Sequence, residues 1–167
     1  MLWYVRITFA IALLGMSGET LARVPLIDEL RSRLAKSDVA AVNAYLSANW
    51  ETKMAQLGRL VQRCDQDALE LSVDLLSTTN LEALQGHVYS LEVAMGKCPE
   101  KLIPMVPNAQ IKSLCAVDAY SETHPSARLV DEIDKRVKQI GKTKQLAASE
   151  NGQACIDAYQ AARQRLQ

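Results

Sequence analysis

The sequence predicts an all-α protein: a compact multi-helix bundle or an irregular array of antiparallel helical hairpins, held by two disulfides. Apolar residues recur at every third or fourth position along nearly the whole chain, which is the period of an amphipathic helix. The alternation of apolar and polar residues that marks a strand is nearly absent. Glycine and proline lie at the boundaries of the periodic segments, and four cysteines are available for pairing.

The first 22 residues have the layout of a secretory signal peptide. Arg6 precedes an apolar run from Ile7 to Met16, and small and polar residues follow as far as Ala22. The run is shorter than the roughly 20 apolar residues that span a bilayer. We therefore expect cleavage after Ala22 and a single mature domain over residues 23–167; the alternative is an uncleaved membrane anchor.

The rest of the chain carries no second apolar stretch of membrane-spanning length. We accordingly expect a periplasmic protein that does not contact the membrane after cleavage. The chain has 19 basic and 19 acidic residues, so its net charge is zero and nothing in it favours binding to nucleic acid.

Two short helices are expected first. One runs from Pro25 to Lys36, with a leucine at every fourth position and proline in the first turn, where it is tolerated. Ser37 or Asp38 caps the next segment. That segment carries four apolar side chains on one side: Val39, Val42, Leu46 and Trp50.

A long helix is expected from Trp50 to Ser77, because a single apolar seam continues over this stretch. Asp65 could cap a new helix and so divide it. Residues 78–80 (Thr-Thr-Asn) form a turn, and a second helix follows from Leu81 to about Lys97. A short connection between two helices makes them antiparallel neighbours.

The C-terminal part is divided by prolines and by one Asn-Gly pair. A connection over residues 98–107 contains three prolines, which exclude a long helix there. A helix capped by Asn108 is expected to reach Glu122, and His124-Pro125 ends it. Two further amphipathic helices are expected, one before Gly141 and one after Gly152.

The predicted hairpin favours one pairing of the cysteines. Cys64 lies about 14 residues before the turn and Cys98 about 18 residues after it. At a rise of about 1.5 Å per residue, their heights differ by roughly 6 Å, about one helical turn. We therefore predict the bond Cys64–Cys98, which leaves Cys115–Cys155; four cysteines allow three pairings, so the other two remain open.

The sequence predicts no catalytic or metal site. His87 and His124 are the candidate bases, but no serine has the Gly-x-Ser-x-Gly context and no short-spaced cluster of metal-ligating residues occurs. We expect His87 to be a core residue and His124 to belong to a turn. The expectation is a protein without enzyme activity and without a cofactor.

Charge is unevenly distributed along the neutral chain. Residues 65–96 contain six acidic residues and neither lysine nor arginine, whereas residues 135–144 contain five basic residues and no acid. Asp67, Glu70 and Asp74 are spaced to share one helix face. Either the acidic hairpin packs near the basic helix and the two compensate within the fold, or the acidic face binds a basic partner.

In overall character the chain resembles the helical periplasmic immunity proteins that protect bacteria from type VI secreted cell-wall amidases. The resemblance covers the signal peptide, the size of the mature domain, the helical pattern and the cysteines, and it includes no binding motif. It implies a periplasmic inhibitor, with a homodimer left open, that occludes the active site of a peptidoglycan-degrading enzyme. Such enzymes act on an anionic polymer and are often basic.

We expect the partner to contact the acidic hairpin and an apolar anchor in the proline-containing connection. The predicted partner-binding residues are Asp67, Glu70, Asp74, Glu82, Ile103, Met105 and Val106. Two alternatives remain. The connection could instead pack over the disulfide, and the protein could be a periplasmic structural or chaperone-like helical module with many weak clients.

Overall fold

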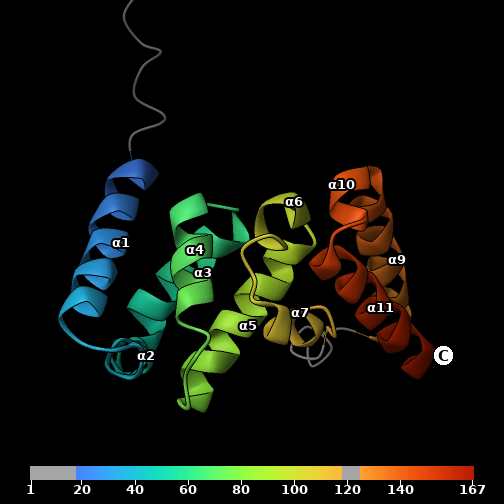
Figure 1. Cartoon of the computed structure of the whole chain (residues 1–167). Coiled ribbons are helices and arrows are strands. Elements are labelled where there is room, and N and C mark those ends of the chain that lie inside the picture. The colour runs from blue at the N-terminus through green and yellow to red at the C-terminus, as the bar shows by residue number, and fades with distance from the viewer. Residues whose placement is uncertain (1–17, 118–124) are drawn as a thin grey trace, which may run out of the picture.

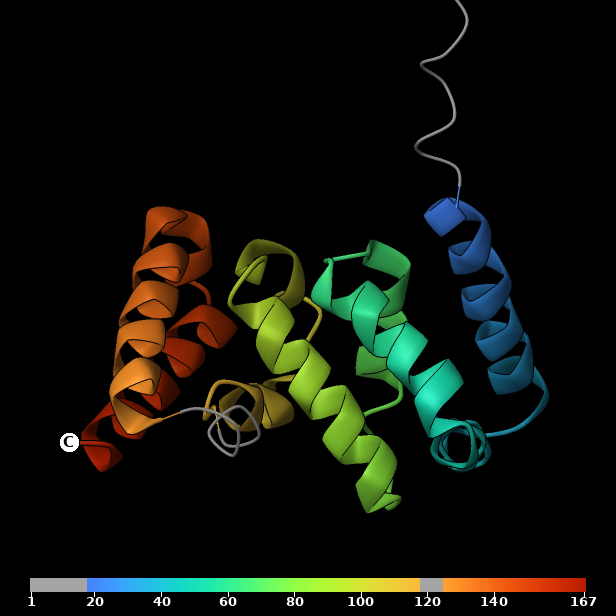
Figure 2. The same ribbon diagram turned by 180° about the vertical axis from the view of Figure 1, so that it is seen from behind.

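The computed structural model describes residues 18–117 and 125–167, and this part of the chain is all-α, as the sequence predicts. The helices stand side by side in a row that begins with α1 and ends with α9, α10 and α11 (Figures 1 and 2). The architecture is thus the irregular array of helical hairpins among the predicted alternatives. Residues 1–17, which hold most of the predicted signal peptide, lie outside the described residues.

The first two helices are α1 (Gly18–Lys36) and α2 (Val39–Ala48). The predicted start at Pro25 is wrong, because α1 begins seven residues earlier and Pro25 lies inside it. The predicted cap of α2 is confirmed: the Asp38 carboxylate accepts a hydrogen bond from the backbone N–H of Ala41 at 2.8 Å. This bond satisfies one of the free N–H groups at the helix start.

The predicted long helix from Trp50 to Ser77 is wrong, because the chain divides there into η1 (Trp50–Met54, a π-helix), α3 (Ala55–Gln62) and α4 (Gln66–Asp74). The break falls where the sequence allowed one. Cys64 has a positive φ of 61°, which turns the chain out of the helix, and Asp65 caps α4 through the N–H of Ala68.

Helix α5 (Leu81–Met95) returns beside α3 and completes the predicted hairpin. The predicted bond Cys64–Cys98 is confirmed and closes the end of the hairpin opposite its turn. Two lysines near this bond, Lys97 and Lys101, donate hydrogen bonds to backbone carbonyls on the other arm of the hairpin. Lys97 donates to the carbonyl of Gln62 at 2.9 Å, and Lys101 donates to that of Cys64 at 3.3 Å.

The remaining helices are α6 (Pro99–Leu102), α7 (Asn108–Leu114), α9 (Ser126–Lys142), α10 (Lys144–Ala147) and α11 (Glu150–Arg165). The predicted bond Cys115–Cys155 is confirmed and joins the end of α7 to α11. The expected continuation of the helix from Asn108 to Glu122 is wrong, because α7 ends at Leu114 and Val117 takes a positive φ of 56°. His124 lies outside the described residues.

The core extends continuously along the row, and one buried polar contact crosses it. Arg136 of α9 is 2% exposed and donates to Glu132 at 3.1 Å and to the hydroxyl of Tyr159 at 3.4 Å. The phenol is fully buried and its pKa is raised by loss of solvent. Glu92 of α5 is also fully buried near Tyr159, and the hydrogen bond between Arg136 and Tyr159 joins α9 to α11.

Among the described residues, no helix is both long enough and apolar enough to cross a bilayer.

Candidate partner-binding surface

Two of the four predicted acidic residues, Asp67 and Glu70, are paired within the fold. They lie on α4 and face α1, whose Arg31 reaches Asp67 Oδ1 and Glu70 Oε2, each at 3.3 Å. All three side chains are close to half exposed, so solvent screens the attraction. The sequence did not single out Arg31, because it belongs to a helix 36 residues away along the chain.

The basic helix α9 is not the internal partner of this acidic face. It lies at the opposite end of the row from α1 and α4, with α5, α6 and α7 between them (Figures 1 and 2). Helix α9 therefore does not neutralise Asp67, Glu70, Asp74 or Glu82, although Glu92, at the other end of the hairpin, is buried close to the contact between Arg136 and Tyr159. The two predicted charge clusters instead occupy separate ends of an elongated array.

The other two predicted acidic residues, Asp74 and Glu82, are exposed. In the described part of the chain neither forms an ion pair, and Arg31 is the cation that pairs with Asp67 and Glu70. Asp74 and Glu82 therefore contribute negative charge that no ion pair among the described residues neutralises. Such an excess of negative charge attracts cationic partners and raises their rate of association.

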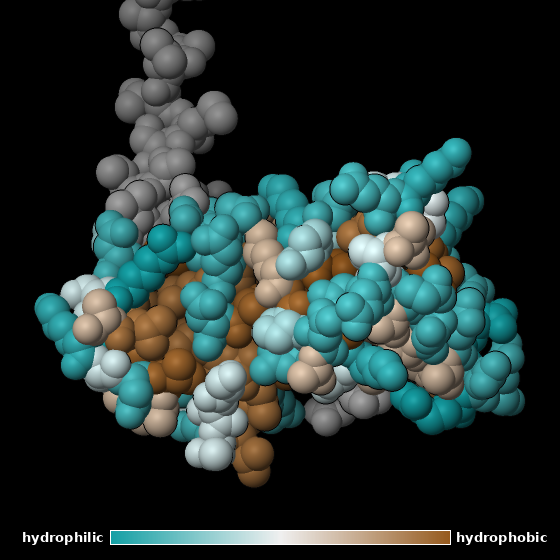
Figure 3. All heavy atoms as spheres, in the orientation of Figure 1, coloured by the Kyte–Doolittle hydropathy of each residue, from teal (hydrophilic) through white to brown (hydrophobic). Residues whose placement is uncertain are grey.

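Asp74 and Glu82 enclose the turn between α4 and α5, which we call the tip (residues 74–82). The start of α5 projects at the lower edge of the molecule in Figure 1. The tip carries Leu81, which is 78% exposed. Figure 3 shows hydrophobic colouring at the same projecting edge. Sequence reasoning missed Leu81, which it took only as the first residue of a helix.

The tip is fixed by hydrogen bonds on both sides of its turn. Asn80 Oδ1 accepts from the N–H of Ala83 and from the hydroxyl of Ser47, both at 3.0 Å. The N–H of Asn80 in turn donates to Thr78 Oγ1 at 3.1 Å. These bonds cap α5 and tie the tip to α2, so the exposed leucine is presented by an ordered backbone.

A buried row of side chains lies beneath the tip and joins α2, α4 and α5. The hydroxyl of Ser72 lies 2.7 Å from His87 Nδ1, and His87 Nε2 lies 2.9 Å from Asn43 Oδ1. Asn43 Nδ2 donates to the carbonyls of Val39 and Leu75, so its Oδ1 must accept. His87 Nε2 therefore carries the proton and Nδ1 accepts from Ser72.

Burial governs the chemistry of this row. Burial lowers the pKa of His87 to about 4, so the ring is neutral at physiological pH. Ser72, His87 and Asn43 are at most 1% exposed, which agrees with the core role expected for His87. The bonds of His87 to Ser72 and Asn43 fix α5 against α4 and α2, and the bond from Asn43 to Leu75 fixes the end of α4 where the tip begins.

The predicted apolar anchor in the proline-containing connection is wrong. Ile103 is fully buried and Val106 is 2% exposed, while Met105 is half-buried. The physical reason is that the turn after α6 folds back on the start of α11. There Asn151 Nδ2 donates to the carbonyls of Ile103 and Val106 at 3.2 and 2.8 Å. The connection packs into the core against α11, whereas the alternative that the sequence left open placed it over the disulfide.

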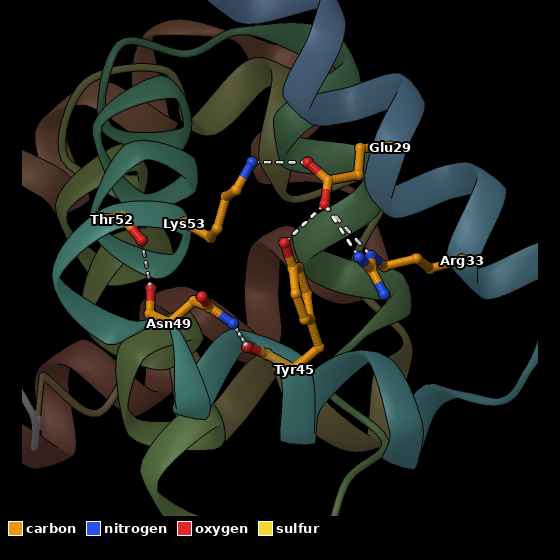
Figure 4. A network of polar contacts seen from close by, with 6 residues as sticks. All are labelled: Glu29, Arg33, Tyr45, Asn49, Thr52 and Lys53. Carbon is orange, nitrogen blue, oxygen red and sulfur yellow. Dashed lines mark hydrogen bonds and ion pairs between the residues drawn. The ribbon is translucent and has the colours of Figure 1, made fainter.

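A cluster of polar side chains around the carboxylate of Glu29 holds α1, and with it Arg31, against the rest of the array (Figure 4). Glu29 accepts from Lys53 of η1 at 2.6 Å, from the hydroxyl of Tyr45 at 2.6 Å and from Arg33 at 3.3 Å. The Lys53 ammonium is the main cause that lowers the pKa of Glu29 to about 2. Arg33 also stacks over the ring of Tyr45, with its Cζ 3.7 Å from the centroid.

The π-helix places Lys53 in this cluster. The carbonyl of Asn49 accepts hydrogen bonds from three successive N–H groups, those of Thr52, Lys53 and Met54. This wide turn rotates Lys53 toward α1. A π-turn of this kind cannot be read from apolar periodicity, because it changes the phase of the helix without changing the residue types.

A cleft of about 490 Å³ lies at the other end of the row, between the turn after α6 and the start of α11. Its lining surface is mainly apolar but includes two carboxylates. The lining residues are Glu100, Pro104, Asn108, Thr143, Gln145, Leu146, Ser149, Glu150 and Asn151. The described residues contain no group of histidine, cysteine and acidic side chains arranged to hold a metal ion.

No family model, no curated protein and no solved structure matches this chain. The surface around the tip must therefore be interpreted from its own geometry and charge.

Proposed function

We propose that this chain is an exported, non-catalytic binding protein that acts as a periplasmic immunity protein or inhibitor. In this proposal it occludes the active site of a peptidoglycan-degrading effector enzyme. The observation that carries the proposal is the tip, where exposed Leu81 shares an ordered turn with two exposed carboxylates that form no ion pair with any described residue. A rigid, anionic projection suits the cleft of a basic enzyme, because charge complementarity selects the partner and speeds the encounter.

Two features support export. The chain forms two disulfides, which are typical of proteins in an oxidising compartment such as the periplasm. Cleavage after Ala22 would also leave Pro25 in the first turn of the shortened α1, where a missing N–H costs no hydrogen bond. In the uncleaved helix the same proline lies after seven helical residues.

The proposal is tested with the oxidised protein as bait in a low-salt lysate of its own organism. We expect one stoichiometric basic hydrolase, released by high salt, whose cleavage of purified peptidoglycan the bait inhibits. A mixture of weakly bound clients together with suppressed aggregation would contradict the proposal and favour the structural or chaperone-like module.

The charge dependence is tested with the double reversal Asp74→Lys/Glu82→Lys. Both side chains are exposed and form no ion pair within residues 18–117 and 125–167, so binding should weaken while thermal stability changes little. Reversing Asp67 or Glu70 is less informative, because a lysine there would face Arg31 and loosen α1. A double reversal that left inhibition unchanged would exclude the tip as the contact surface.

A further inference from the structure

We propose that Leu81 is the anchor of this interaction: it enters an apolar pocket on a folded partner protein, and lysine or arginine side chains at the rim of that pocket pair with Asp74 and Glu82. The inference rests on the proposed function and deepens it, since it names the contact surface and the chemistry of the site that receives it.

The exposure of Leu81 is the first argument. It is the one large hydrophobic side chain that is exposed in the described part of the chain, at 78%. Single exposed leucines are common on protein surfaces and need no explanation by themselves. This one is the first residue of α5, whose start projects at the lower edge of the molecule (Figure 1), where a partner cleft can enclose it from several sides. Full burial of a leucine strengthens binding by about tenfold or more, which is the scale of a binding hot spot.

Charge decides the kind of partner. Glu82 follows Leu81 directly in the chain, and Asp74 is the last residue of α4 before the turn. An anionic membrane surface would repel both carboxylates, and nucleic acid would do the same. A pocket rimmed by lysine or arginine would pair with them, so the complementary partner is a protein with a cationic, apolar-floored cleft.

The order of the tip is the third argument. Asn80 is held by Ser47 and caps α5 through Ala83, while Asn43 holds the carbonyl of Leu75 on the other side of the turn. The leucine is therefore presented before the partner arrives. An ordered anchor loses less conformational entropy on binding than a flexible loop does, so more of its burial energy appears as affinity.

A chemical probe tests this surface without the natural partner. β-Cyclodextrin bearing amino groups on its rim offers an apolar cavity surrounded by ammonium groups, and neutral β-cyclodextrin offers the cavity alone. Amide shifts of the full chain, followed by NMR during titration, should concentrate on residues 78–84 for both probes. The amino probe should bind several-fold more tightly, because it pairs with the two carboxylates.

Variants separate the two parts of the surface. Leu81→Ala should abolish the shifts with both probes, and Asp74→Asn/Glu82→Gln should remove the advantage of the amino probe. The matched control Asp131→Asn/Glu150→Gln neutralises two exposed carboxylates elsewhere, one of them at a helix start, and should leave that advantage intact. Shifts that persist in Leu81→Ala, or that map away from the tip, would overturn the inference.

The same variants are then measured against the hydrolase captured as described above. Leu81→Ala should weaken binding at least about tenfold with an unchanged circular dichroism spectrum. If the hydrolase binds Leu81→Ala as tightly as the natural chain, the anchor is refuted and the proposed function stands. If the probes bind the tip as expected but no hydrolase is inhibited, the proposed function fails instead.

Discussion

Acidification from pH 6.5 to pH 4 should lower the free energy of unfolding through one buried side chain, His87. Its ring is neutral in the folded protein, because burial lowers its pKa from 6.5 to about 4. In the unfolded chain the ring takes up a proton below pH 6.5. Stability is therefore complete above pH 6.5 and is lost as the pH falls toward 4, at about 1.4 kcal/mol per pH unit. The total loss is about 3 kcal/mol.

The assay is urea unfolding of the oxidised protein at half-unit steps between pH 7.5 and pH 4. Trp50 reports on this region, because its ring lies against Gly86, the neighbour of His87. The variant His87→Gln should show a nearly flat profile over this range. It should also be less stable at pH 7.5, since Ser72 and Asn43 lose a buried partner.

The control variant is Ser72→Ala, which removes one hydrogen bond but keeps the buried imidazole. Its whole stability curve should lie lower while the slope between pH 6.5 and pH 4 is preserved, because burial is the cause of the shift. Equal slopes for the natural chain and His87→Gln would refute this reasoning. They would mean that other groups govern the response to acid.

Three further predictions concern stability. Glu29→Gln should lower the free energy of unfolding by about 1–2 kcal/mol at pH 7, measured by thermal unfolding, since the Glu29 side chain is 29% exposed and solvent partly screens its ion pairs. The stabilisation by the carboxylate is present above pH 4.5 and is lost as the pH falls toward 2. Over that range the stability of the variant should therefore change little with pH. Cys115→Ser/Cys155→Ser opens a loop with a sequence separation of 40 and should cost about 4 kcal/mol by urea unfolding; a loss below 1 kcal/mol would contradict the loop-entropy argument. Gly152→Ala, in α11, should lower the melting temperature of the protein measured by circular dichroism, because the Cβ of the alanine would collide with the backbone carbonyl of Leu146. An unchanged melting temperature would show that the backbone shifts to accommodate the Cβ.

Apolar periodicity was sufficient for the fold class, because each helix buries one face against its neighbours along the row. The disulfide pairing followed from helical rise, since Cys64 and Cys98 lie at similar heights on the two arms of one hairpin. Periodicity failed where the backbone departs from the α-helix. The π-turn at Trp50–Met54 and the positive φ of Cys64 divide one apolar seam into three elements without interrupting its pattern.

The surface was predicted only in part. Spacing along one helix brought Asp67 and Glu70 together, but their partner Arg31 and the network beneath the tip depend on contacts between distant segments. Ile103 and Val106 were predicted to be exposed but are buried, because the sequence alone does not show whether an apolar residue in a loop is an anchor or part of the core. Leu81 is exposed because α5 begins beyond the edge of the packed row, which helical periodicity does not reveal.

The connectivity of the two disulfides bears on how the chain matures. Each cysteine pairs with the next one along the sequence, Cys64 with Cys98 and Cys115 with Cys155, so the two bonds close separate loops. In a chain that enters an oxidising compartment with its N-terminus first, the correct partner of Cys64 is also the first one to arrive. Oxidation of the cysteines in the order in which they enter thus gives the native pairing. The bond Cys64–Cys98 can then form before the helices that follow it have entered the compartment.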